Sequence, residues 1–180
     1  MTLLVCPLSK VKEMIALHKP GRVISLLDPE WAFPELGHHY VGLHLRLAFH
    51  DVHAPAEGHV LPSAKHIGDL LRFLIAWDGS DSLLIHCRAG IGRSTAAAFI
   101  AACYANPHTD EHHIAAALRR ASPLARPNES FIKLADSEMG RSGRMSDAIA
   151  LTGRGLPWID VEEGEPFQMS STYGRGNTAQ

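Results

Sequence analysis

The chain has 180 residues and a mass of 19.6 kDa, a size typical of one domain with or without a tail. Hydrophobic residues make up 46% and charged residues 20%, values typical of a chain that folds around a core. The 17 Lys and Arg residues nearly balance the 19 Asp and Glu residues, giving a formal net charge of −2. This balance disfavours a chain-wide basic surface for nucleic acid or an anionic membrane.

Three further features of the sequence bear on the cellular location of the protein. No apolar run approaches the ~18–20 residues that span a bilayer, and residues 1–10 lack the pattern of a signal peptide. Cys6, Cys87 and Cys103 are odd in number and widely spaced, which disfavours a disulfide framework. We therefore expect a cytoplasmic protein in a reducing environment.

Histidine is unusually frequent, with 12 residues, and five lie close together in sequence: His38, His39, His44, His50 and His53. A metal site is one interpretation of this group. Ligands on a strand alternate and ligands on a helix recur at i and i+4, whereas His38 and His39 are adjacent and face different directions. There is also no His-Glu-x-x-His motif. We therefore expect scattered histidines, no metal and no other cofactor.

The first half of the chain predicts alternating strands and helices. The expected elements are a strand over 3–6, a helix over 10–17, a buried strand over 23–27, a half-buried strand over 40–47, and a helix from residue 63 or 64 to about 77. In the 40–47 segment the alternation places Val41, Leu43, Leu45 and Leu47 on one face. A loop over 48–62 follows this strand.

The second half predicts one more strand and then helices. The expected elements are a strand over 82–86 and helices over 94–104, 110–121, 128–139 and 144–152. This order indicates an α/β fold with a central mixed, mostly parallel sheet flanked by helices and with a helical C-terminal layer. We expect a catalytic domain over 1–140, and over 141–180 a short helix with a flexible tail in its last ~20 residues.

The stretch from His86 to Ser94, His-Cys-Arg-Ala-Gly-Ile-Gly-Arg-Ser, is the most informative part of the sequence. It lies between a buried strand and a helix, so its backbone N–H groups and the helix N-terminus are expected to surround one point. Such a nest binds anions. Gly90 and Gly92 permit the close backbone approach that a nest requires. The guanidinium of Arg93 can hold two phosphate oxygens at once.

Cys87 lies at the base of this expected nest. A helix N-terminus and nearby cations lower the pKa of a thiol from about 8.5 to about 3.5–7.5. We therefore expect Cys87 to be a thiolate nucleophile aimed at bound phosphorus. We expect His86 to orient the loop from beneath, and Ser94 to hydrogen-bond the sulfur when it leaves as a thiolate.

These residues match His-Cys-x-x-Gly-x-x-Arg-Ser/Thr, so the chain resembles the cysteine-dependent protein tyrosine phosphatase superfamily, in particular its small dual-specificity-like members. A chance match in a chain of this length is on the order of 10⁻⁴ or less. Asp51 stands 36 residues before the cysteine, where such members have a loop with a general acid. The stretch 126–131, with Asn128, is similar to the Pro-Asn-x-x-Phe that opens a late helix in the family.

The resemblance implies metal-independent hydrolysis of phosphomonoesters through a phosphocysteine intermediate. The implied catalytic residues are Cys87, Arg93, Asp51 and Ser94; the implied substrate-binding residues are Arg88, Ala89, Gly90, Ile91, Gly92 and Arg93; the supporting residues are His86 and Asn128. The Trp-Pro-Asp form of the acid loop is absent, so Asp51 is assigned by position and loop context, with Asp69, Asp78 and Asp81 as rivals.

The implied substrate is a phosphotyrosine or phosphoserine/threonine protein or a small phosphomonoester. Inositides are less favoured because no Lys lies between Cys87 and Arg93. Two other functions stay open: a rhodanese-type sulfurtransferase, whose cysteine loop is commonly one residue shorter, and a non-catalytic phosphate-binding module. We expect no nucleic-acid or membrane partner, and the oligomeric state stays open.

Overall fold

The computed structural model describes residues 2–52, 54–55, 57–153, 155–156 and 161–173. Over these residues the strands are β1 (Thr2–Pro7), β2 (Arg22–Leu27), β3 (Leu43–Ala48), β4 (Leu83–Cys87) and β5 (Phe167–Ser170). They form one sheet in the order β3-β2-β4-β1-β5. The first four strands are parallel to one another and β5 runs antiparallel to β1. This confirms the mixed, mostly parallel sheet.

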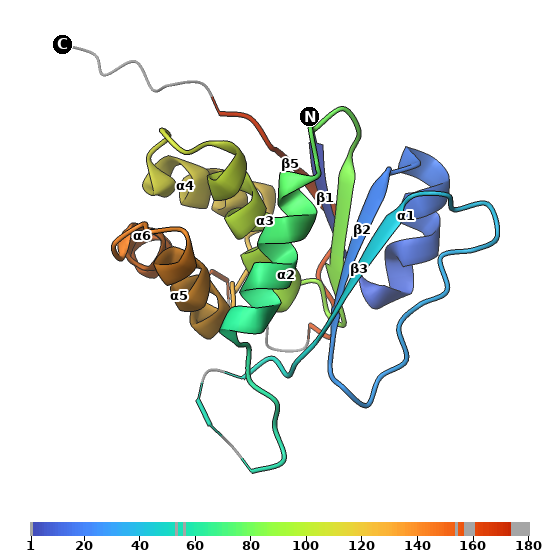
Figure 1. Ribbon diagram of the computed structural model, residues 1–180, viewed down its shortest axis with the longest axis horizontal. Coiled ribbons are helices and arrows are strands. Elements are labelled where there is room, and N and C mark those ends of the chain that lie inside the picture. The colour runs from blue at the N-terminus through green and yellow to red at the C-terminus, as the bar shows by residue number, and fades with distance from the viewer. Residues whose placement is uncertain (1, 53, 56, 154, 157–160, 174–180) are drawn as a thin grey trace.

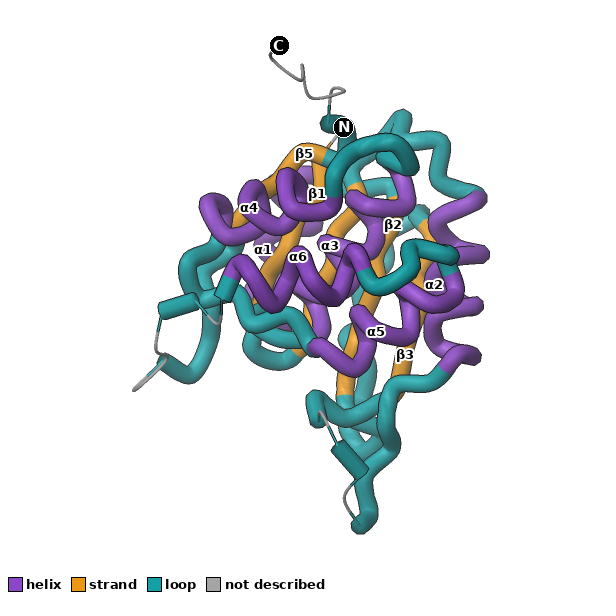
Figure 2. The backbone as a smooth tube through the Cα atoms, turned by 90° about the vertical axis from the view of Figure 1, so that its left-hand side faces the viewer, coloured by secondary structure: helices purple, strands orange, loops and turns teal. Residues whose placement is uncertain are grey.

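Helices cover both faces of the sheet (Figure 1). They are a short 3-10 turn (Leu8–Lys10), α1 (Val11–His18), α2 (Ala64–Ile75), α3 (Arg93–Ala105), α4 (Glu111–Ala121), α5 (Glu129–Glu138) and α6 (Arg144–Thr152). Helix α1 lies alone on one face, and α2 to α6 lie on the other. Figure 2 shows α4, α5 and α6 as the layer farthest from the sheet on that second face, which confirms the helical C-terminal layer.

The core is divided by the sheet into a large and a small part. The large part lies under α2 to α6 and includes almost all of α3, in which the alanines at 96–98, 101 and 102 are fully buried. Small side chains let this helix pack closely on β4 and on its helical neighbours. The small part lies under α1 and consists of Leu4, Cys6, Val11, Met14, Val23 and Leu84.

The expected helices and strands are all present, with shifted ends. The largest shift is in the segment 40–47, where β3 begins only at Leu43. Val41 is 96% exposed, and Leu43, at the edge of the sheet, is 53% exposed, so the expected apolar face of this strand is buried only in its second half. Alternation of side chains specifies a strand but not which of its residues another element covers.

The chain's end differs from the expectation. The short helix over 144–152 is observed as α6. Residues 167–170, expected in a flexible tail, instead form β5 and pair with β1 from Thr2 to Val5. The interpretation of this segment as a tail is therefore wrong: Phe167 and Met169 face the core, and their burial fixes the strand. Residues 174–180 lie outside the described residues, and the boundary after residue 140 stays a prediction.

The described residues contain neither a candidate membrane span nor a candidate metal site. None of the helices found there has the length and apolarity to cross a membrane. No group of three or more His, Cys, Asp or Glu side chains in the same part of the chain is arranged to hold a metal ion. Two of the clustered histidines have other partners: His44 contacts Ser25, and His50 contacts Glu30. His53 lies outside the described residues.

Candidate active site

The loop 87–93 lies at one edge of the sheet, where β4 ends and α3 begins. The carboxyl ends of β1, β2, β3 and β4 all meet at this edge, the lower one in Figure 1, because the four strands are parallel. The segments after β2 and after β3 therefore reach the loop from two sides. In open α/β sheets this edge is where ligands bind.

Cys87 lies at the bottom of the loop, and only 1% of it is exposed. Its Sγ accepts the backbone N–H of Gly90 over 3.2 Å and lies 3.1 Å from the hydroxyl oxygen of Ser94. Both groups can donate to a sulfur that bears negative charge. The structure therefore brings Ser94 to the nucleophile candidate, as the sequence predicts.

Three backbone carbonyl groups of the loop 87–93 form hydrogen bonds that hold the loop in place. The carbonyl oxygen of Arg88 accepts from Leu8 N–H (3.0 Å), that of Ala89 from Gly164 N–H (2.8 Å), and that of Ile91 from Arg126 N–H (2.9 Å). In a trans peptide the N–H points opposite to the C=O. The N–H groups of residues 89, 90 and 92 therefore point away from these outer partners, and the N–H of Gly90 does reach Cys87 Sγ. This is the arrangement of an anion nest.

Both glycines of the loop are required by its geometry. Gly90 has φ +73°, and a Cβ there would lie 2.8 Å from the backbone nitrogen of Pro7. A Cβ on Gly92 would lie 2.0 Å from Oδ2 of Asp51. A larger residue would therefore strain the loop at the first position and displace the acid candidate at the second.

Arg93 is 3% exposed and enters the site from the first turn of α3. Its Nη1 donates to Oδ1 of Asp28 over 2.7 Å and to the carbonyl of Phe49 over 2.5 Å. Its buried Nε has no hydrogen-bond partner among the described residues and lies 3.9 Å from Oδ2 of Asp51. One buried N–H of the guanidinium is therefore able to donate to an oxygen of a bound anion.

Asp28 is a site residue that the sequence analysis missed. It directly follows β2, at the same edge of the sheet as the loop 87–93. An acidic residue immediately after a buried parallel strand is the signal that could have identified it, once the order of the strands was known. Its contact with Arg93 fixes the direction of the guanidinium.

Asp51 reaches the loop from the segment after β3. Its Oδ1 accepts from the side-chain amide of Asn128 over 2.7 Å, and its side chain is 36% exposed. Asn128 Oδ1 in turn accepts the N–H of Phe131 and so caps α5. The structure therefore brings Asp51 and Asn128 to Arg93, at the end of the loop that begins at Cys87.

The three other candidates for the general acid form contacts away from the loop 87–93. Asp69 forms ion pairs with Lys65 and Arg72 along α2. Asp78 accepts the N–H of Ser80 in a turn, and Asp81 accepts from the indole N–H of Trp77. None of these contacts is with the loop 87–93, so Asp51 is the acid candidate that the geometry favours.

Arg88 and His86 differ in their exposure to solvent. Arg88 is exposed, and its guanidinium carbon stands 4.4 Å above the ring of Trp31, a cation–π contact. His86 is fully buried, and its Nε2 lies 2.5 Å from the hydroxyl of Ser25. Burial lowers the pKa of His86 to about 4, so its ring is neutral at pH 7.

The two other thiols differ from Cys87 in their surroundings. Burial raises the pKa of Cys6 to about 12 and that of Cys103 still further. Cys103 lies in α3, ten residues beyond Arg93, which places it about 15 Å along the helix from the loop. Neither thiol is a nucleophile candidate at neutral pH.

Comparisons with known proteins give a match only by structure. No protein-family model matches this chain, and no curated protein does. A human tyrosine phosphatase-like serine/threonine/tyrosine-interacting protein is 19% identical, with a TM-score of 0.59 over 78% of this chain and 92% of that chain. Human DUSP28 is 16% identical, with a TM-score of 0.57 over 78% and 89%. The phosphatase domain of Yvh1 from Chaetomium thermophilum is 17% identical, with a TM-score of 0.58 over 79% and 93%.

These likenesses span most of both chains in each pair. At such low sequence identity these likenesses establish the fold of the backbone only. The chemistry of the site must be argued from the residues of the loop 87–93. The chain therefore has the fold of the small dual-specificity phosphatases, as the resemblance of its loop motif predicts.

Proposed function

We propose that this protein is a metal-independent phosphomonoester hydrolase that acts on phosphotyrosine or phosphoserine/threonine proteins. The observation that supports this most is the meeting of Cys87 Sγ, the buried Arg93 and Asp51 at one loop. A nucleophile, a cation for the phosphoryl oxygens and a carboxyl group for the leaving oxygen are the parts that such a reaction needs.

In the first step Sγ of Cys87 attacks phosphorus in line with the leaving oxygen. An S–P bond forms, the P–O bond to the leaving group breaks, and the carboxyl of Asp51 gives its proton to that oxygen. Arg93 Nε and the loop N–H groups bind the equatorial oxygens as their charge redistributes. Catalysis by these groups rests on positioning and electrostatics.

In the second step a water attacks the phosphorus of the phosphocysteine. Asp51, now a carboxylate, takes a proton from this water, the S–P bond breaks, and inorganic phosphate is released. The electron pair of the broken bond returns to Cys87 Sγ. The hydroxyl of Ser94, 3.1 Å from that sulfur, and the N–H of Gly90 stabilise the thiolate that results.

The substrate and the setting are part of the proposal. A phosphorylated protein or a small phosphomonoester fits the loop, and the exposed Arg88 on Trp31 offers a contact beside it. Three unpaired cysteines support a cytoplasmic location. We propose no nucleic-acid or membrane partner, since the net charge of −2 provides no chain-wide basic surface.

A second candidate function is a non-catalytic phosphate-binding module. The name of one fold neighbour, a phosphatase-like interacting protein, gives this alternative its support. The presence of Cys87, Arg93 and Asp51 at one loop favours hydrolysis, because binding alone does not need an acid beside the anion site. The five residues between Cys87 and Arg93 likewise favour phosphorus chemistry over a rhodanese-type sulfur transfer.

The test is hydrolysis of para-nitrophenyl phosphate and of phosphotyrosine and phosphothreonine peptides, with thiosulfate as the sulfurtransferase substrate. We expect phosphate release that Cys87→Ser abolishes and Arg93→Ala lowers about 10²–10³-fold. Asp51→Asn should lower kcat about 10²-fold and flatten one limb of the pH profile. Phosphopeptide binding by the Cys87→Ser protein without turnover by the wild type would support the binding module instead.

A further inference from the structure

The segment that leads into β5 lies beside the loop 87–93. Because β5 runs antiparallel to β1, it begins at the edge of the sheet where β1 and β4 end. The residues before it, 161–166, therefore reach the loop that follows β4. Gly164 in this segment is buried, and its N–H donates to the carbonyl oxygen of Ala89 over 2.8 Å.

The carbonyl of Ala89 and the N–H of Gly90 belong to the same peptide group. This peptide is trans, so the two groups point in opposite directions. On the inner side, the N–H of Gly90 donates to Cys87 Sγ over 3.2 Å. The bond from Gly164 on the outer side and the bond to the sulfur on the inner side therefore require the same orientation of one peptide group.

The loop alone leaves the orientation of this peptide open. Its spacing sets the path of the backbone, but residue 90 has φ +73°, and glycine adopts negative φ about as readily. A rotation of the peptide by about 180° would turn its carbonyl oxygen toward Cys87 Sγ, where it would repel a thiolate. The same rotation would leave the buried N–H of Gly164 without its acceptor. Gly164 therefore favours the orientation that stabilises the thiolate.

The absence of a side chain at residue 164 permits this contact. A Cβ there would lie 3.2 Å from Cγ1 of Ile91 and 3.6 Å from the carbonyl oxygen of Ala89. The first of these distances is tight for a side-chain contact. Glycine thus lets the backbone of the segment 161–166 come within hydrogen-bond distance of the loop.

Two anchors hold the segment 161–166 against the loop. Phe167, which directly follows it, pairs with β1 and is buried in the large core. Within the segment, the carboxylate of Glu163 accepts from the hydroxyl of Ser9, in the 3-10 turn that follows β1. The position of the Gly164 N–H therefore depends on β5 and on the start of the chain.

We propose that Gly164 is a positioning residue for Cys87. Its N–H holds the peptide between residues 89 and 90 in the orientation that directs the N–H of Gly90 to the sulfur, so the segment 161–170 forms part of the site. This inference rests on the proposed function for its meaning in catalysis. Its content, the dependence of the Cys87 thiolate on an N–H from outside the loop, can be measured without any turnover.

The experiment separates the N–H of Gly164 from the space that a side chain would fill. Gly164→Pro removes the N–H, because proline has none. Gly164→Ala keeps the N–H and adds the Cβ, so it is the matched control. Each protein is assayed for the pH dependence of Cys87 alkylation by iodoacetamide, read by mass spectrometry of the peptide that contains Cys87. The values of kcat and KM on para-nitrophenyl phosphate and the Tm are measured beside it.

A second pair of variants leaves residue 164 unchanged. Phe167→Ala removes the anchor that follows the segment 161–166. Leu74→Ala is its control, because Leu74 is also buried in the large core but lies in the last turn of α2. Both variants remove a large apolar side chain from the core, so both should lower Tm.

We expect Gly164→Pro to raise the pH midpoint of Cys87 alkylation by about one unit, because the N–H that stabilises the thiolate no longer faces the sulfur. The value of kcat/KM should fall about 10–100-fold. Phe167→Ala should raise the midpoint by less, since the N–H of Gly164 is kept but held less firmly. Gly164→Ala and Leu74→Ala should keep the wild-type midpoint.

The controls decide what causes a shift. An unchanged midpoint in Gly164→Pro overturns the inference even where Tm falls, because the role of Gly164 would then be structural only. An equal shift in Gly164→Ala also overturns it, since the added Cβ would be the cause. Where Gly164→Pro does not fold, Phe167→Ala decides: a shift that Leu74→Ala lacks supports the inference, and any other result overturns it.

The results also separate this inference from the proposed function. A raised midpoint in Gly164→Pro, beside a wild type that hydrolyses no phosphate ester, supports the positioning role and overturns the proposed function. Phosphate release by the wild type, beside an unchanged midpoint in Gly164→Pro, supports the proposed function and overturns the positioning role.

Discussion

Asn128 donates its side-chain amide to Oδ1 of Asp51 over 2.7 Å, while its own oxygen accepts the N–H of Phe131 at the start of α5. One side chain thus joins the acid candidate to the N-terminus of a helix. Its amide also contacts the carbonyl of Val52. The segment after β3, which is otherwise a loop, is therefore held to the helical layer at the residue where a proton would be transferred.

The first prediction separates these two roles of Asn128. Asn128→Asp keeps an oxygen for the cap of α5 but places a second carboxylate beside Asp51. We expect kcat to fall about 10–100-fold and the pH limb assigned to Asp51 to move to higher pH, with Tm little changed. Asn128→Ala, which removes the cap as well, should also cost about 1 kcal/mol of stability in urea unfolding. A wild-type pH profile in Asn128→Asp would contradict a role for this contact.

The second prediction concerns the partner of the guanidinium. The side chain of Asp28 is 18% exposed, and it forms an ion pair with Arg93, whose side chain is 4% exposed. Asp28→Asn keeps the shape but removes the charge that holds Nη1, so Arg93 should lose its fixed direction. We expect kcat/KM for para-nitrophenyl phosphate to fall about 10–100-fold, measured beside Asp69→Asn, which removes a carboxylate of an exposed helical pair. Equal effects of the two variants would count against the contact.

The parts of the site that lie in one continuous stretch could be predicted from the sequence. The residues from Cys87 to Ser94 fix their own geometry through a strand, two glycines and a helix start, so their spacing specifies the loop. Asp51 could be placed by its distance in sequence from Cys87. Its contacts could not be predicted, because they depend on where α5 lies.

Contacts between residues on strands that are distant in sequence could not be predicted. Asp28 stands 65 residues before Arg93, and only the strand order β3-β2-β4-β1-β5 brings its segment to the loop. The sequence predicts a tail over 167–170 because the end of the chain is polar and glycine-bearing in composition. The two apolar residues of this segment, Phe167 and Met169, are buried because the segment pairs with the edge strand β1. This long-range pairing cannot be predicted from the local pattern of residues.

The third prediction tests this last strand. Phe167 is 9% exposed and packs into the large core from β5. Phe167→Ala should destabilise the protein by about 3 kcal/mol, since it removes a buried aromatic ring at the edge of the sheet. Gln168→Ala, on the exposed face of the same strand, should change stability by less than about 0.5 kcal/mol. Urea unfolding followed by circular dichroism gives both values, and equal effects would show that β5 does not contribute to the core.

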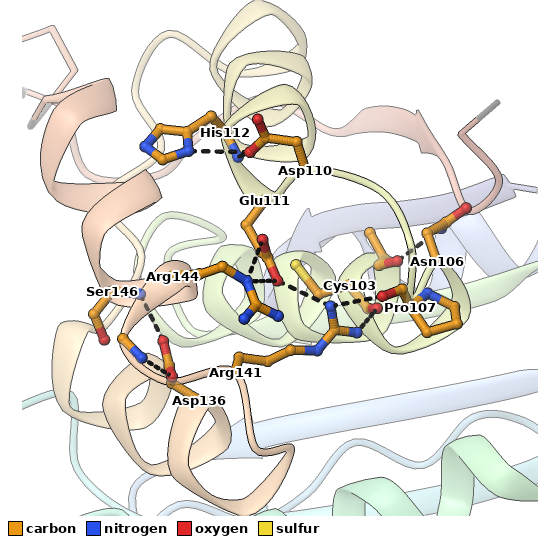
Figure 3. A network of polar contacts seen from close by, with 12 residues as sticks. Cys103, Asn106, Pro107, Asp110, Glu111, His112, Asp136, Arg141, Arg144 and Ser146 are labelled. Atoms are coloured by element: carbon orange, nitrogen blue, oxygen red, sulfur yellow. Dashed lines mark hydrogen bonds and ion pairs between the residues drawn. The ribbon is translucent and has the colours of Figure 1, made fainter. Parts of the chain in front are cut away.

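The helical layer holds a buried ion pair between Glu111 and Arg141 (Figure 3). Oε1 of Glu111, in the first turn of α4, lies 2.9 Å from Nη1 of Arg141, and Oε2 lies 3.2 Å from Nε of Arg144. Arg141 also donates to the carbonyl of Cys103 in α3. The segment that leads into α6 is therefore tied to both α4 and α3 by charged groups, two of which are almost fully buried.

The fourth prediction is a loss of stability when this pair is broken. Burial acts to raise the pKa of Glu111, but the hydrogen bonds from Arg144 and Arg141 outweigh it and hold this pKa below its usual value of 4.5. A carboxyl with a lowered folded-state pKa stabilises the protein above pH 4.5, and this contribution is lost as the pH falls through the folded-state pKa. Glu111→Gln leaves Arg141 buried without its charge partner, which should cost about 3–5 kcal/mol at pH 7.

The exposed pair of Lys10 and Glu13 supplies the matched control, since its atoms are also 2.9 Å apart. Glu13→Gln should change the free energy of unfolding by less than about 1 kcal/mol, because water screens that pair. The stability of Glu111→Gln should in addition fall less steeply than that of the wild type below pH 4.5, since one group that takes up a proton on unfolding is gone. Urea unfolding at pH 7, 5 and 3.5 measures all three proteins, and parallel curves for Glu111→Gln and wild type would refute the assigned role of Glu111.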